Sequence, residues 1–299
     1  MTDFLAFRGE FAALSAAALW ALATLLFGRL GKQLSPLVLN LVKGSIAIAL
    51  ILLTLAVRQQ LTTSLPAISV ILLVLSGVIG IGLGDTAYFA TVNALGPRRA
   101  LLMEMLAPPL SALLALVTLQ ETLSPLAWLG IGLTLAGIAW VITERVPTLR
   151  QLPSRWQRGI ILGILAALGQ SVGAVLSRAA LADTVVDPLW STLLRLAAGL
   201  VFMVGLLGVR PDLRSGLQPL RSPRLIGGVA IAAFFGTYLA IWLQQTALKY
   251  APTGIAQSLL ATSPIFVLPM ALLIGERVTL RAMLGALVAL MGVCLLFAG

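Results

Sequence analysis

The sequence predicts an all-α polytopic membrane protein with ten transmembrane helices in two inverted five-helix repeats. Three observations support this fold class. Hydrophobic residues make up 60% of the 299 residues and charged residues only 10%, and the mean hydropathy is +1.05. Ten apolar segments have the length that crosses a bilayer, roughly twenty residues. The last five segments also resemble the first five. Because backbone groups in lipid must be satisfied within their own segment, each apolar segment is expected to be a helix.

Proline marks the start of several segments, where its missing N–H does no harm. The first segment follows one basic residue, Arg8, and we expect an uncleaved first helix rather than a signal peptide. The predicted helices span residues 11–28, 36–57, 67–93, 98–119, 125–143, 159–179, 188–209, 225–249, 253–274 and 279–298.

An internal repeat divides the chain into two units. Residues 97–141 match residues 252–296 at a constant shift, and the front parts of the two units agree more loosely. The matched pairs include Pro109 with Pro264, Glu121 with Glu276, Gly130 with Gly285, Gly137 with Gly292, and Lys43 with Arg195. We place the first unit at 1–145, a linker loop at 146–157 and the second unit at 158–299. Since five helices is an odd number, the two units should enter the membrane in opposite senses, as in transporters with a site between their halves.

The net charge of +10 comes from basic residues in short loops, so we predict no nucleic-acid partner. Of 20 Lys and Arg residues, fourteen lie in odd-numbered loops, four in even loops and termini, and two within helices. The positive-inside rule therefore places the odd loops in the cytoplasm and both termini outside. The chain has no histidine and a single cysteine, Cys294, so neither a metal site nor an internal disulfide is expected. No nucleotide-binding loop is found, so no cofactor is predicted and transport would use ion gradients.

Four ionisable residues lie within apolar segments: Lys43, Asp85, Glu104 and Arg195. A charge at the bilayer centre costs about 2.5–3.5 kcal/mol, so these side chains should face the interior of the bundle. Lys43 and Glu104 are expected at roughly 10 Å from one membrane face and Asp85 at roughly 15 Å, from the helical rise per residue. One interpretation is a structural lock. In the other, Asp85 or Glu104 takes up a proton or binds a cation, while Lys43 or Arg195 binds a carboxylate.

Two further features concern helix regularity. The glycine-rich stretch that ends at Asp85 is either a helix–helix contact face or a locally unwound segment. Pro108 and Pro109, and Pro264 in the second unit, predict paired kinks. Polar and aromatic side chains in apolar segments are the predicted substrate contacts, because an amide in hydrocarbon needs a partner. They are Trp20, Tyr88, Gln170, Tyr238, Trp242, Gln245 and Gln257.

The order and spacing of several short motifs resemble the EamA family of the drug/metabolite transporter superfamily. In the first unit these motifs are Gly84-Asp-Thr-Ala-Tyr-Phe89, Ala94-Leu-Gly-Pro-Arg-Arg-Ala100, Ala107-Pro-Pro109 and Gln120-Glu121. The second unit has Gln245-Thr-Ala-Leu248, Ala251-Pro252, Ser263-Pro264 and Gly275-Glu276. The resemblance implies export of amino acids and related metabolites through a central cavity. It also implies cytoplasmic termini, the reverse of the basic-loop prediction.

Together these features predict an inner-membrane secondary transporter of a bacterium that exports small metabolites, such as amino acids, by alternating access. The alternative is proton-coupled efflux of lipophilic cationic drugs. An intramembrane enzyme and a scaffold protein are disfavoured, because the chain has no histidine for catalysis and its loops are too short to form a docking domain. The expected partners are a small-molecule substrate, the lipid bilayer and, as a further candidate, protons. A duplicated chain that already contains both halves is compatible with a monomer.

Overall fold

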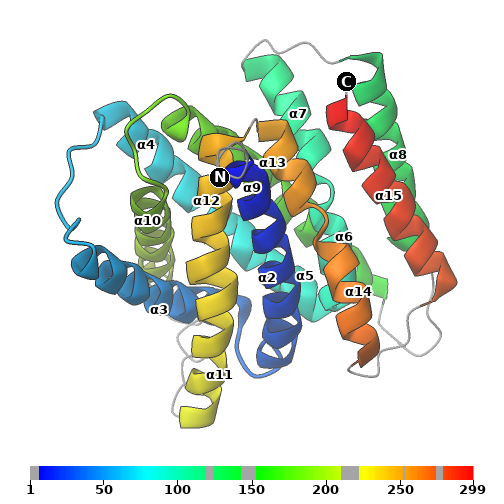
Figure 1. Ribbon diagram of the computed structural model, residues 1–299. Coiled ribbons are helices and arrows are strands. Elements are labelled where there is room, and N and C mark those ends of the chain that lie inside the picture. The colour runs from blue at the N-terminus through cyan, green and yellow to red at the C-terminus, as the bar shows by residue number, and fades with distance from the viewer. Residues whose placement is uncertain are drawn as a thin grey trace.

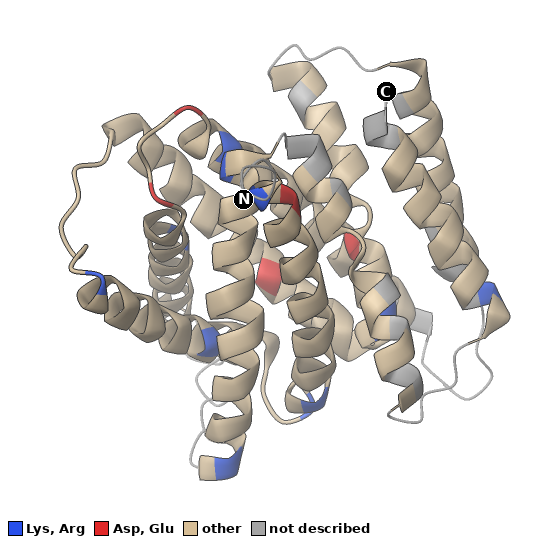
Figure 2. Ribbon diagram, viewed as in Figure 1, with Lys and Arg blue, Asp and Glu red and all other residues tan. Residues whose placement is uncertain are grey.

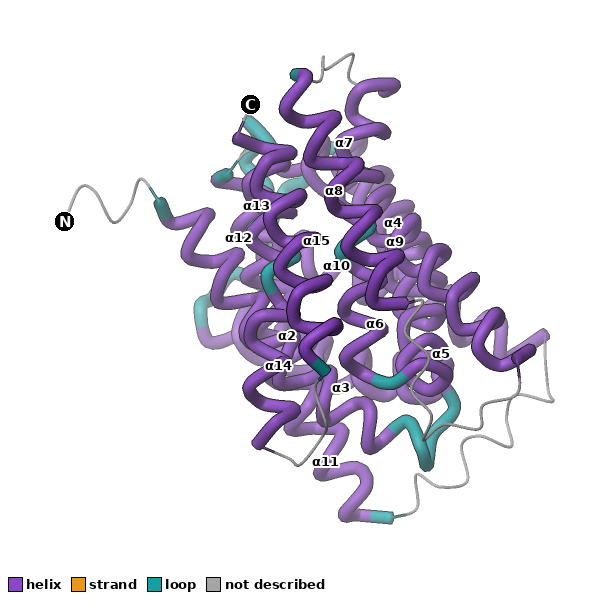
Figure 3. The backbone as a smooth tube through the Cα atoms, turned by 90° about the vertical axis from the view of Figure 1, so that its right-hand side faces the viewer, coloured by secondary structure: helices purple, strands orange, loops and turns teal. Residues whose placement is uncertain are grey.

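The computed structural model describes residues 7–118, 124–142, 153–209, 222–251, 253–273 and 279–298, and within them every regular element is a helix (Figures 1 and 3). The all-helical prediction is therefore confirmed for these residues. The first half contains α2 (Arg8–Leu30), α3 (Pro36–Val57), α4 (Ala67–Ser76), η1 (Gly77–Asp85), α5 (Thr86–Leu95), α6 (Pro97–Glu104), α7 (Ala107–Thr118) and α8 (Pro125–Ile142).

The second half repeats this order of elements. It contains α9 (Pro153–Leu181), α10 (Pro188–Val209), α11 (Pro223–Ala233), η3 (Phe234–Leu239), α12 (Ala240–Tyr250), α13 (Thr253–Leu260), α14 (Ser263–Leu273) and α15 (Leu280–Ala298). α9 begins within the predicted linker, 146–157, whose residues 146–152 lie outside the described part of the chain.

Seven helical segments of the described chain are long and apolar enough to cross a membrane. They are Arg8–Leu30, Pro36–Val57, Ala67–Leu95, Pro97–Thr118, Arg155–Leu181, Pro188–Val209 and Pro223–Tyr250. The other three predicted crossings correspond to α8, α13 with α14, and α15. Large apolar side chains such as Leu53, Ile68 and Val201 are more than 60% exposed, as expected for surfaces in contact with lipid. The protein is a multi-pass membrane protein.

Proline and glycine determine several helix ends. Ser35 caps α3 by accepting a hydrogen bond from the Val38 N–H at 3.4 Å, and Pro36 occupies the first turn. Gly96 separates α5 from α6 with φ of +87°, a conformation that other residues adopt only with strain. The following Pro97 then begins α6, which directs the chain sharply from one membrane segment into the next.

Two kinds of helix irregularity occur in both halves. η1 and η3 are π-helical stretches within longer helices, and η1 contains the glycine-rich stretch. Its glycines also form a contact face, because η1 packs against α9 and α10. The second irregularity is a break between α6 and α7, matched by a break between α13 and α14. These breaks lie just before Pro108 and Pro264, where the sequence predicts kinks.

The last helices of the two halves, α8 and α15, pack side by side (Figure 1). A Cβ atom at Gly137 would lie 2.7 Å from the Gly285 carbonyl oxygen, and one at Gly292 would lie 2.7 Å from the Gly130 carbonyl oxygen. Gly130 and Gly285 are matched in the repeat, as are Gly137 and Gly292. A reciprocal contact of this kind is produced when two copies pack around a two-fold axis.

Small side chains allow α2 to reach the centre of the bundle. Ala13, Ala16, Ala17 and Ala21 are fully buried, and α2 packs against α12, α13 and α14 of the second half. Close approach of helices through small residues is typical of membrane bundles. α2 therefore lies between the two halves and contributes side chains to the cavity described next.

Candidate functional site

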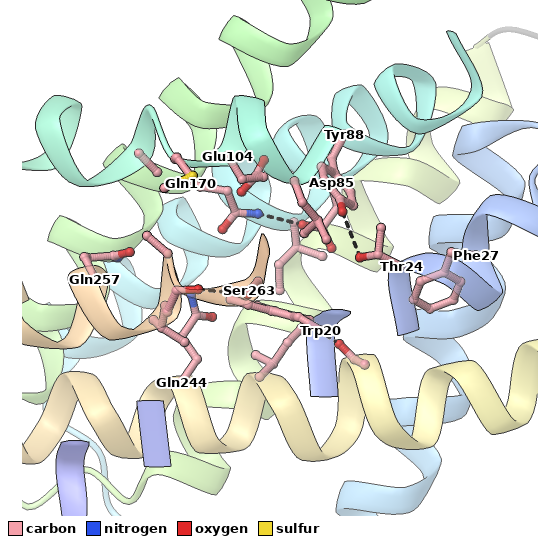
Figure 4. Close-up of a pocket in the computed structure, with 18 of the residues that line it drawn as sticks. Trp20, Thr24, Phe27, Asp85, Tyr88, Glu104, Gln170, Gln244, Gln257 and Ser263 are labelled. Atoms are coloured by element: carbon pink, nitrogen blue, oxygen red, sulfur yellow. Dashed lines mark hydrogen bonds between the residues drawn. The ribbon is translucent and has the colours of Figure 1, made fainter. Parts of the chain in front are cut away.

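One cavity lies where the two halves meet (Figure 4). Its empty volume is about 890 Å³, which includes space continuous with the outside. The first half contributes side chains from α2, α3, η1, α5, α6 and α7, and the second half from α9, α10, η3, α12, α13 and α14. Corresponding elements of the two repeats thus line one space. Eight of the predicted site residues are among the lining residues: Trp20, Lys43, Asp85, Tyr88, Glu104, Gln170, Arg195 and Gln257.

Asp85 joins three helical segments. Its Oδ2 atom accepts from Lys43 Nζ at 2.5 Å, and its Oδ1 atom accepts from Gln170 Nε2 at 2.8 Å. Lys43 is only 3% exposed, and its Nζ atom also lies 5.1 Å from the centre of the Phe89 ring. Because Gln170 belongs to α9, this chain of contacts connects the second half of the protein to the charge pair of the first half.

Arg195 is buried in a recess lined by glycines. Its side chain is 2% exposed, and a Cβ atom at Gly80 or Gly173 would lie 3.2 or 3.5 Å from its Nη2 atom. Nη1 donates a long hydrogen bond of 3.4 Å to Gln244 Oε1, while Nε is buried without a partner in the described part of the chain. The guanidinium group therefore retains unused donors within a cavity wall.

Glu104 lies at the C-terminal end of α6, next to the helix break, and lines the same cavity. Its Oε1 atom is buried and has no hydrogen-bond partner among the described residues. Tyr88 is nearby in Figure 4 and shares a 2.8 Å hydrogen bond with Thr24. The figure shows Glu104, Asp85 and Gln170 on one side of the cavity and Gln244 on the other.

Side chains from neighbouring helices bind carbonyl groups in both π-helical stretches. In η1, the Ile81 carbonyl accepts from Asn40 Nδ2 at 2.7 Å, and the same amide donates to Thr86 Oγ1 at 2.9 Å. In η3, the Gly236 carbonyl accepts from Trp20 Nε1 at 3.0 Å. A π-bulge disturbs the regular backbone ladder and is frequent at functional sites. Asn40 and Trp20 thus stabilise the irregular segments beside the cavity.

Replacing Asn40 with Leu should destabilise the protein by about 1–3 kcal/mol, the usual cost of leaving a buried carbonyl without its donor. Asn40 is fully buried, so water cannot replace the amide. Thermal melting of the purified protein measures the effect. Ser45→Ala on the same helix is the control, since the exposed Ser45 hydroxyl bonds only to the Leu41 carbonyl of its own helix. Equal melting temperatures for the two variants would contradict the assigned role of Asn40.

Three predicted contacts lie away from the cavity lining, and their role in substrate binding stays a prediction. Tyr238 shares a 2.7 Å hydrogen bond with Thr54, Trp242 stacks under the Arg58 guanidinium at 4.9 Å, and Gln245 accepts from Ser191 at 2.8 Å. The cavity instead contains Gln244, together with Thr24 and Ser263. Successive residues of a helix differ by about 100° in direction, so neighbouring glutamines face different surroundings. The described residues contain no group of three or more potential metal ligands.

Comparison with known proteins gives the class of this protein. The model of the EamA-like transporter family matches residues 7–143 and again residues 157–298, so it covers both halves. The chain belongs to the EamA-like transporter family, and the resemblance inferred from its motifs is confirmed.

The chain is also similar to individual proteins. Over 145 residues it is 35% identical to the uncharacterized protein PA1977 of Pseudomonas aeruginosa. The aligned region makes up 48% of this chain and 47% of that protein. The chain thus spans about half the length of this curated relative in the match. A crystal structure of a protein with 16% identity superposes with a TM-score of 0.70 over 97% of this chain and 96% of the other. That similarity shows a shared fold.

Proposed function

We propose that this protein is a secondary transporter that exports small metabolites, such as amino acids, by alternating access across the bacterial inner membrane. In this proposal the ten transmembrane helices form two inverted repeats, and the two halves have equivalent roles in opening the cavity to either side. The observation that best supports the proposal is the cavity, because corresponding elements of both repeats line it and it contains buried charged and polar side chains. Sites between inverted repeats are typical of secondary transporters.

The contacts from Lys43 through Asp85 to Gln170 couple ligand binding in this cavity to the conformation of the two halves. Asp85 lies at the C-terminal end of η1, and Gln170 reaches it from α9 of the other half. A substrate or proton that competes for the Asp85 carboxylate would release this connection between the halves. Bistable contacts of this kind are what a ligand must bias to change a conformational equilibrium.

The alternative function, efflux of lipophilic cations, fits the cavity less well. Glu104 and Asp85 provide acidic groups, but Asp85 is paired with Lys43. Arg195 places a buried positive charge in the same cavity. Because a cation bound there would be repelled by this charge, we favour metabolites that also contain an acidic group.

Basic residues colour the ribbon where α2 ends and where α11 and α15 begin, and others lie near the start of α2 (Figure 2). Arg29 lies in the last turn of α2. This arrangement supports cytoplasmic odd loops and external termini under the positive-inside rule. Cysteine accessibility at the two chain ends in inverted and right-side-out vesicles tests the orientation.

Reconstitution into liposomes tests the proposed transport. Vesicles loaded with radiolabelled amino acids, nucleosides or sugars should release one class faster than protein-free vesicles. An imposed proton gradient should change this rate if protons are the coupling ion, and a protonophore should remove the change. Release of none of these metabolites, with or without a gradient, would refute the proposal.

A further inference from the structure

The two repeats supply matched cations to the cavity, but only the first repeat supplies an acid on the helix that follows. Lys43 of α3 and Arg195 of α10 occupy matched positions, and both line the cavity. Asp85, at the end of η1, forms an ion pair with Lys43. The corresponding segment of the second half, Pro223–Tyr250, contains no Asp or Glu. Arg195 therefore has no acid in its own half that matches Asp85.

Arg195 lies close to Asp85, about one helical turn away along η1. A Cβ atom at Gly80 would lie 3.2 Å from Arg195 Nη2. Because the hydrogen bonds of a π-helix connect residues five apart, Gly80 and Asp85 lie on adjacent turns of η1. The Asp85 carboxylate is also near enough to interact electrostatically with Arg195. A movement of about one turn, ~5 Å, would bring the two groups into contact.

The present contacts of Arg195 are weak for a buried guanidinium. Its Nη1 atom donates to Gln244 Oε1 at 3.4 Å, and its Nε atom has no acceptor among the described residues. A carboxylate would accept two parallel hydrogen bonds from this group, which are stronger than a bond to a neutral amide. A buried cation without an acidic partner is costly, so Arg195 should bind Asp85 when Lys43 releases it.

Glycines remove the side chains that would otherwise separate the two groups. Gly80 and Gly84 lie on η1 before Asp85, and a Cβ atom at Gly173 of α9 would lie 3.5 Å from Arg195 Nη2. A larger residue at Gly80 or Gly173 would contact the guanidinium group and restrict its movement. Shifts of one element past another by up to one turn are known in proteins that switch between two states.

We propose that Asp85 exchanges partners during transport, from Lys43 in the present state to Arg195 when the cavity opens to the other side. This inference rests on the proposed alternating access and gives Arg195 a positioning role in it. Alternating access moves one repeat against the other around the site, so a pair within the first half would become a pair between the halves. Each state leaves one buried cation without an acid. The two states therefore have similar electrostatic costs, as a bistable element requires.

The accessibility of a cavity thiol from each side of the membrane measures the two states. Ser263→Cys places a thiol in the cavity wall, and Cys294→Ser removes the single native cysteine. A membrane-impermeant maleimide is added to right-side-out vesicles and to inverted vesicles. The ratio of the two modification rates then follows the ratio of the two access states.

The matched cations should have opposite effects on this ratio. Lys43→Gln should shift it at least ~10-fold towards one side and Arg195→Gln at least ~10-fold towards the other, because each variant removes one of two competing buried pairs. Both variants remove one positive charge, so a direct effect of charge on the maleimide would have the same direction in both. In combination with Asp85→Asn, neither variant should shift the ratio. Lys32→Gln, in the exposed loop before α3, is the control and should keep the wild-type ratio.

Three results would overturn the exchange of partners: an unchanged ratio, shifts of both variants in the same direction, and opposite shifts that persist with Asp85→Asn. If Arg195→Gln fails to fold, Lys43→Gln with and without Asp85→Asn decides, since the shift must depend on Asp85. Modification from one side only, in the wild type and in every variant, would refute alternating access and the proposed function with it. Modification from both sides at an unchanged ratio would refute the exchange alone.

Discussion

Asp85→Asn should abolish transport and lower the free energy of unfolding by about 3–5 kcal/mol, the usual effect of breaking a buried ion pair by removing one partner. Lys43 is 3% exposed and would lose its acidic partner. The contact with Gln170 would also change, because Asp85 Oδ1 accepts its hydrogen bond. Thermal melting and initial efflux rates from liposomes measure the two effects separately.

The double variant Lys43→Gln/Asp85→Asn distinguishes a structural lock from a coupling device. It removes both charges and keeps side chains of similar size, so stability should recover most of the loss. Transport should stay absent, because the carboxylate that a proton or substrate competes for is missing. Recovery of transport along with stability would instead identify the pair as a lock. Asp183→Asn is the control, since Asp183 is exposed with φ of +53°, a conformation that Asn adopts readily.

Hydropathy and the positions of proline predicted the helices well, because the bounds of a membrane helix depend on its local sequence. The bounds of α3 and α10, 36–57 and 188–209, agree with the predicted ranges, since proline begins each helix and hydropathy ends it. The breaks before Pro108 and Pro264 follow from the same local chemistry. The breaks lie beside the cavity because matching elements from the two repeats meet there.

The sequence could not predict which charged side chains pair with each other, and the reason is physical. Depth along a helix gives one coordinate, and on that basis Lys43 could pair with Asp85 or with Glu104. The rotation of each helix decides the partner, and η1 is π-helical rather than α-helical, which changes the direction of the side chains that follow. For the same reason the sequence could not predict which of Gln244 and Gln245 faces the cavity. Both are polar and adjacent, but the packing of α12 against α10 directs Gln245 to Ser191 and Gln244 to the cavity.

The contact between α8 and α15 should be sensitive to added volume. Gly137→Val would place a branched side chain against the backbone of α15, where even a Cβ atom would lie 2.7 Å from the Gly285 carbonyl oxygen. Overpacking usually costs about 1–3 kcal/mol, and we expect at least the top of this range because backbone atoms cannot change rotamer. Gly292→Val, at the matched position of the second repeat, should destabilise the protein by a similar amount.

Gly132→Val is the control on the same helix, since a Cβ atom at Gly132 meets nothing within 4 Å and should be tolerated. Thermal melting in detergent compares the three variants. Neither α8 nor α15 lines the cavity, so the fraction of Gly137→Val that remains folded should bind ligand with wild-type affinity. The variant would then change stability without changing binding, because the outer helix pair contributes packing between the repeats while the inner helices form the site. Equal melting temperatures for Gly137→Val and Gly132→Val would contradict the reciprocal glycine contact.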